Sequence, residues 1–127
     1  MTIQNRKDAR NSLMTAIEAI TDFAEVYDHL AKDLKGESPV CTIESGPAEY
    51  AWHPSDQNAF KFIVIVWVRR DSAADAEDTL DDLGYEVATA IEGWHSATFY
   101  QESDPSYDEI DGVMYRSEAH YVSVEWE

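Results

Sequence analysis

The sequence is poor in several residue types, and each shortage excludes a class of protein. Cys41 is the single cysteine in 127 residues, so no disulfide forms within the chain. No apolar run approaches the roughly 20 residues that a membrane-spanning helix needs, and residues 1–8 lack the apolar core of a signal peptide. The five glycines are scattered singly, which excludes glycine-rich nucleotide-binding loops. We expect the protein to be synthesised in the cytoplasm and not to associate with a membrane.

Basic residues are scarce as well: nine Lys and Arg stand against 26 Asp and Glu, a formal net charge of −17. Such a surface repels nucleic acid unless basic residues cluster, and these are spread out. Three explanations stay open. The acidity prevents aggregation, or it is an adaptation to high salt, since Lys numbers four while Asp and Glu number thirteen each. The third is functional: the surface lines a passage for DNA or imitates DNA.

What the chain does contain predicts a globular fold. The hydrophobic fraction is 44% and the aromatic fraction 12%, which argues against disorder. A chain of this length buries enough apolar surface to form a core, and residues 1–127 suit one domain.

The most informative stretch runs from Phe60 to Leu83. The segment from about Ala59 to Arg69 is β-branched and aromatic on both faces, which predicts a strand buried on both sides. Ser72, with Asp75 three residues on, is typical of a helix start, and a helix is expected from about Ala73 to Glu92. Asp71, Asp75, Asp78 and Asp82 form an acidic row along this helix.

The remaining elements follow from periodicity and turn residues. Apolar residues at spacings of three and four predict a long helix from about Arg6 to Leu34. A short strand is expected at Val40 to Ile43, a loop at Ser45 to Asn58, and strands at Ala97 to Glu102 and Val113 to Trp126. The acidic, turn-rich connection Ser103 to Gly112 is expected to be a protruding hairpin loop. The predicted fold is α+β with two layers: a mainly antiparallel sheet of about four strands packed by two helices, in the order α-β-β-α-β-β.

No pattern points to catalysis, to a cofactor or to a metal. His29, His53, His95 and His120 stand alone, and none has a second ligand-type residue at metal spacing more often than chance gives. Asp104-x-Ser106-x-Asp108 resembles the first half of a calcium loop, but Glu109 and Tyr115 occupy the positions that require Gly and Glu. We expect no enzyme, and the alternation of Arg116, Glu118 and His120 predicts a polar sheet face or an interface rather than a site.

Three groups of residues are candidates for contacts with other proteins. Aromatic residues in a loop either pack on the core or face a partner. The single adjacent arginine pair ends the central strand, where it could meet the acidic face of another subunit or form a local ion pair of small energy. The candidates are the aromatic loop residues Tyr50, Trp52 and His53, the pair Arg69 and Arg70, and the acidic hairpin residues Asp104, Asp108, Glu109 and Asp111.

The organisation is similar to that of the tail terminator and related minor tail proteins of long-tailed phages and viruses. The similarity covers most of the chain and lies in element order and texture: an N-terminal helix, a strand pair whose second member is Phe60 to Arg69, a helix on the sheet, and a final hairpin from Met114 to Trp126. This resemblance implies a non-enzymatic virion protein, assembled in the host cytoplasm. It implies a ring, usually a hexamer, that caps the tail tube and meets the head connector, with DNA only as passing cargo.

Two other functions are compatible with the sequence. An acidic inhibitor that imitates DNA and binds a basic nucleic-acid-binding protein needs carboxylates along one face, and the Asp71–Asp82 row is the candidate. A small enzyme or ligand-binding domain needs a pocket with converging polar groups.

Overall fold

The computed structural model describes residues 6–29, 34–35, 37–45, 59–70, 73–94, 98–102, 105–110 and 112–125. These residues form two helices and six strands. In chain order the elements are α1 (Arg6–Glu18), β1 (Glu25–Tyr27), β2 (Val40–Ser45), β3 (Ala59–Arg69), α2 (Ala73–Glu92), β4 (Thr98–Glu102), β5 (Ser106–Ile110) and β6 (Val113–Glu125).

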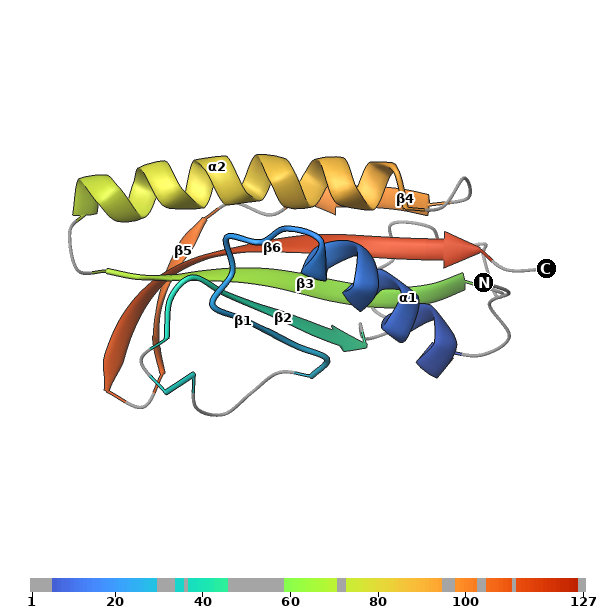
Figure 1. Cartoon of the computed structure of the whole chain (residues 1–127), viewed down its shortest axis with the longest axis horizontal. Helices are drawn as coiled ribbons and strands as arrows, with labels where there is room; N and C mark the ends of the chain where they lie inside the picture. The colour runs from blue at the N-terminus through green and yellow to red at the C-terminus, as the bar shows by residue number, and fades with distance from the viewer. Residues whose placement is uncertain are drawn as a thin grey trace.

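All six strands belong to one sheet, in the order β1-β2-β3-β6-β4, with β5 also paired to β6 (Figure 1). The strand β3 lies at the centre, and the long strand β6 lies beside it. One edge of β6 pairs with β3 over eleven register positions, from Ala59 opposite Glu125 to Arg69 opposite Tyr115. Its other edge pairs first with β5 and then with β4. The pairings are antiparallel except for β1 with β2, which is parallel.

Both helices pack on the same face of the sheet and form the main core with it (Figure 1). Because side chains alternate along a strand, every second residue of β3 faces this layer, including Phe62, Val64 and Val66, all fully buried. They contact the apolar stripes of the helices: Ala9, Leu13 and Ile17 of α1, and Ala76, Leu80, Leu83, Val87 and Ile91 of α2. The expected α+β organisation in two layers is confirmed.

A second, smaller core lies on the opposite face of the sheet. Leu34, Val40, Trp67 and Tyr115 are its buried members. The Trp67 indole donates a hydrogen bond to Thr42 Oγ1 at 2.9 Å, and its ring meets the Tyr115 ring edge-on. This core explains why β3 is apolar on both faces, as its sequence predicts.

The predicted long N-terminal helix is wrong beyond Glu18. Ile20 N–H donates to the Ile17 carbonyl at 2.9 Å and closes the last turn, after which Glu25–Tyr27 joins the edge of β2. This segment contains β-branched and aromatic residues, which favour strands. Val26 packs against the main core while Tyr27 packs against the smaller one, as in a strand. Tertiary pairing therefore overrides a helical spacing of apolar residues.

The connection Ser103 to Gly112 also differs from the prediction. Ser106–Ile110 is a strand, not part of a loop, and it forms a hairpin with β6. Gly112 has φ +81°, the left-handed conformation that tight hairpin turns require. The sheet thus contains six strands rather than about four. The predicted bounds of β3 and α2 agree with the structure, and β2, β4 and β6 differ from their predicted ranges by one or two residues.

Candidate interaction surface at the β5–β6 hairpin

Four of the nine predicted contact residues lie in the described part of the chain. Arg69 and Arg70 follow each other at the end of β3, and Asp108 and Glu109 lie in β5. The hairpin of β5 and β6 brings both groups to the same end of the sheet, since Arg69 is the register partner of Tyr115 and Asp108 is the partner of Tyr115 on the other side. The other five candidates, Tyr50, Trp52, His53, Asp104 and Asp111, lie outside the described residues.

The corner formed by Arg69 and Arg70 is fixed by hydrogen bonds that its backbone N–H groups donate. Arg69 N–H donates to Ser38 Oγ at 2.8 Å, and Arg70 N–H donates to the Met114 carbonyl at 3.0 Å. The first bond joins the corner to the segment before β2, and the second joins it to β6. The Arg70 side chain is exposed, so a fixed backbone presents this cation at the surface.

Tyr107 of β5 organises the arginines on the helix side of the hairpin. Its ring lies under two guanidinium groups, with the ring centre 4.3 Å from that of Arg116 and 5.2 Å from that of Arg70. Tyr107 and Arg116 are register partners, which places their side chains side by side. Tyr107 is 54% exposed. We call Arg70, Tyr107 and Arg116 the arginine–tyrosine surface.

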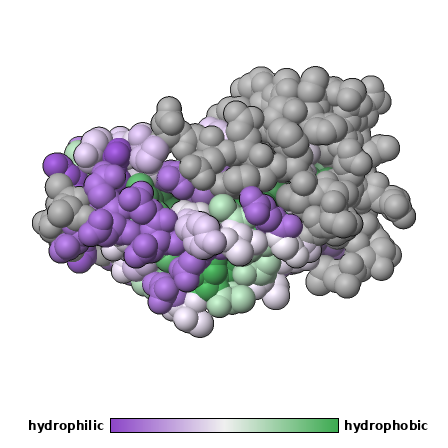
Figure 2. Space-filling model, turned by 90° about the horizontal axis from the view of Figure 1, so that it is seen from above, coloured by the Kyte–Doolittle hydropathy of each residue, from purple (hydrophilic) through white to green (hydrophobic). Residues whose placement is uncertain are grey.

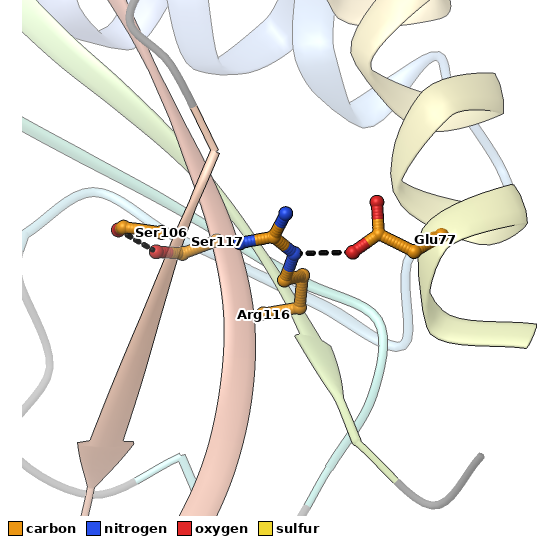
Figure 3. A network of polar contacts seen from close by, with 4 residues as sticks. All are labelled: Glu77, Ser106, Arg116 and Ser117. Carbon is orange, nitrogen blue, oxygen red and sulfur yellow. Dashed lines mark hydrogen bonds and ion pairs between the residues drawn. The ribbon is translucent and has the colours of Figure 1, made fainter. Parts of the chain in front are cut away.

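An ion pair connects this surface to α2. The guanidinium of Arg116 donates a hydrogen bond to Glu77, one turn into the helix (Figure 3). This hydrogen bond is the main cause of a raised pKa for Arg116, and the charges of Glu77 and Asp81 add to it. Arg116 is therefore held in place between Tyr107 and the helix.

The carboxylate of Asp108 is engaged on the other face of the hairpin. Its Oδ2 accepts hydrogen bonds from Ser117 Oγ at 2.6 Å and from Ser106 Oγ at 3.2 Å. The two serine hydroxyls are also in contact with each other (Figure 3). Asp108 thus stabilises the pairing of β5 with β6, while its neighbour Glu109 is exposed.

The predicted polar face of β6 is largely buried. Arg116, Glu118 and His120 do share one face of the strand, but that face lies under α2. Glu118 Oε1 lies 2.9 Å from His120 Nε2, and their side chains are 8% and 0% exposed. The described residues include no group of three or more His, Cys, Asp and Glu side chains placed to hold a metal ion.

The sequence predicted a polar face or an interface at Arg116, but it did not connect this residue with Tyr107 or Glu77. A signal was present: Ser106 to Ile110 and Val113 to Ser117 flank Asp111-Gly112, a pair typical of two-residue hairpin turns. Pairing outward from that turn places Tyr107 opposite Arg116. Glu77 could not be found in this way because its contact depends on how α2 lies on the sheet.

Charge is unevenly distributed over the exterior. The sequence of α2 contains seven acidic residues and no basic one. In Figure 2, which looks down on the helix layer, hydrophilic residues gather over the end at which α2 begins. The arginine–tyrosine surface thus adjoins a strongly acidic helix. Within the described ranges, neither helix has the length and apolar character needed to cross a membrane.

The chain matches no known protein-family model and no curated protein sequence. Its function must therefore be argued from its surfaces.

Proposed function

We propose that the protein is a structural subunit, not an enzyme, that assembles into a ring of about six copies. We further propose that this ring acts as a tail terminator in a virion, capping the tail tube and meeting the head connector. The arginine–tyrosine surface carries the proposal, because it presents the exposed cation of Arg70 and a half-exposed aromatic ring on an otherwise acidic molecule. Tyr and Arg are the residue types most enriched where proteins bind one another.

The position of this surface supports contact between copies. Among the described residues β5 pairs with β6 alone, so its outer edge offers unpaired backbone groups to another chain. The complementary acidic surface lies on a different element, α2. Contacts between two different patches are head-to-tail, and such contacts generate rings when the rotation closes.

The acidity of the exterior is compatible with this role. A negative lining repels the phosphates of DNA, so that DNA passes through a ring as cargo without binding to it. The proposal thus gives one explanation for both the scarcity of basic residues and the gathering of three arginines at one end of the sheet.

The mass in solution tests the proposal. Multi-angle light scattering after gel filtration, at several protein and salt concentrations, is expected to show a species near about six times 14.4 kDa, directly or after purified tail tubes are added. Arg70→Asp should weaken assembly by about tenfold or more in concentration at the midpoint. Arg6→Asp, at an exposed arginine of α1, is the matched control. A strict monomer under all these conditions would contradict the proposal.

The acidic helix supports a second candidate, an inhibitor that imitates DNA. Asp75, Asp78, Asp81 and Asp82 are all exposed along α2, and a basic nucleic-acid-binding protein is the partner that fits such a row. A monomer that displaces DNA from such a protein, and loses this ability when these aspartates are changed to asparagine, would favour this candidate over the ring.

A further inference from the structure

A hollow of about 370 Å³ opens between α1 and α2, at the point where α1 ends. Its floor is apolar: Ile20 and Ala90 also pack against the main core, and Ala19 is exposed beside them. The ring of Tyr85, which is 75% exposed, forms part of the wall. The hollow therefore offers apolar surface to another molecule without any change in the fold.

The rim of this hollow is negatively charged. Asp22 follows α1 and Glu86 belongs to α2, and both carboxylates are exposed. Within the described residues neither takes part in an ion pair. The last turn of α1 contains no basic residue, although the C-terminal end of a helix favours a nearby cation. An apolar floor with an acidic rim suits a ligand that combines a cation with apolar side chains.

The hairpin of β5 and β6 carries that combination. Among the described residues three large apolar side chains are exposed: Tyr85 at the hollow, and Tyr107 and Met114 in the hairpin. Met114 stands two positions before Arg116, the register partner of Tyr107, so all three share one face of the hairpin. The guanidinium of Arg70 lies 5.2 Å from the centre of the Tyr107 ring. One face of the hairpin therefore presents an aromatic ring, a methionine and an exposed cation together.

The hollow and the hairpin lie on opposite sides of α2. Glu77, which binds Arg116 of the hairpin, and Glu86, which lines the hollow, are separated by about two and a half helical turns. A copy therefore cannot place its hairpin in its own hollow. Two copies can join these surfaces head to tail.

We propose that the hollow receives this face of the hairpin from a second copy of the chain. The guanidinium of Arg70 pairs with Glu86 of the neighbour, and Tyr107 and Met114 cover the apolar floor and the Tyr85 ring. Each copy uses its hairpin on one neighbour and its hollow on the other, as a ring requires. This inference rests on the proposed function and specifies one of its contacts.

A charge exchange between the two sides tests the contact. Arg70→Glu and Glu86→Arg each place like charges in the interface, and each should raise the midpoint concentration of assembly by about tenfold or more. In the double variant the pair again has opposite charges, and most of the loss should be recovered. Asp75→Arg, at an exposed aspartate about three turns before Glu86, is the control for Glu86→Arg and should leave the midpoint within about threefold.

Tyr85→Ala tests the apolar part of the contact. Because the ring is largely exposed in the single copy, the thermal midpoint of the isolated subunit should stay unchanged, while assembly weakens by about tenfold. If the wild type assembles and Arg70→Glu weakens it, but Glu86→Arg and Tyr85→Ala do not, the ring stands and this contact is refuted.

The remaining outcomes also decide between the possibilities. Absence of recovery in the double variant refutes the pairing of Arg70 with Glu86. If Glu86→Arg and Tyr85→Ala form normal rings and lose only their binding to purified tail tubes, the hollow holds the tube protein and the contact between copies is refuted. A wild type that stays monomeric under every condition overturns both the ring and the contact.

Discussion

Replacement of Gly84 by alanine is expected to have opposite effects in two backgrounds. In a helix interior Ala is favoured over Gly by about 1 kcal/mol. At this position, however, the three heavy atoms nearest to a new Cβ all belong to Glu118, with Oε1 at 2.5 Å, Cδ at 3.4 Å and Oε2 at 3.7 Å. The side chain must therefore withdraw, and it loses its 2.9 Å contact with His120.

The two terms can be weighed against each other. A new carbon atom this close to a buried side chain overpacks the site, which typically costs about 1–3 kcal/mol. After the gain in helix propensity is subtracted, Gly84→Ala should destabilise the wild type by about 1 kcal/mol. In a Glu118→Ala background the obstruction is absent, and the same change should stabilise the protein by about 1 kcal/mol.

Urea unfolding at 25 °C, followed by circular dichroism, measures both free energies, provided that the m-values agree. Gly93→Ala is the control, because its Cβ would meet the Thr89 carbonyl at an ordinary 3.5 Å. It should change stability by less than about 0.5 kcal/mol. If Gly84→Ala stabilises the wild type as much as it stabilises the Glu118→Ala variant, the carboxylate moves aside without loss of free energy, and the expected steric conflict is refuted.

Three further predictions concern single buried or half-buried groups. Trp67→Phe removes the indole donor to Thr42 and should lower the free energy of unfolding by about 1–3 kcal/mol; a loss below about 0.5 kcal/mol in urea titrations would contradict the role of this bond. Burial raises the pKa of Glu44 above its ordinary 4.5. The protonated carboxyl therefore stabilises the folded state below pH 4.5, and this contribution is lost as the pH rises through the raised pKa. Glu44→Gln should therefore raise the thermal midpoint at pH 7 but not at pH 4, and equal shifts at both values would refute this. Burial also raises the pKa of the Cys41 thiol, so a thiol reagent at pH 8 should label the native protein only as fast as it unfolds; rapid labelling without denaturant would show that the thiol is accessible.

The sequence predicts the centre of this fold well because two different signals agree there. The stretch Ala59–Arg69 is apolar on both faces, and the structure has an apolar core on each side of β3. The helix Ala73–Glu92 has both a capping pattern and a continuous apolar stripe. Where local propensity and burial point the same way, the predicted bounds agree with the structure.

The prediction fails where one pattern fits two structures. In residues 19–34 the apolar spacing suits a helix. It also suits a strand, in which the adjacent residues Val26 and Tyr27 point to opposite faces of the sheet. The choice is made by the edge of β2, which lies elsewhere in the sequence. The close approach of Glu118 to Gly84 could not be predicted for a similar reason. A glycine inside a helix indicates only lower helix stability, until the strand packed against it is known to carry Glu118 at that point.

The long pairing of β3 with β6 has a consequence for the order of folding. β3 can gain its long partner only after α2, β4 and β5 have been synthesised, because all three lie between the paired strands in the chain. Until then one edge of a strand with two apolar faces is open, which is the state in which chains aggregate. Non-local pairing of this kind is also slow to form. A nascent chain that stops before Val113 therefore contains β3, its most aggregation-prone segment, without β6, the strand that pairs with its edge. We expect such shortened products to be insoluble rather than partly active.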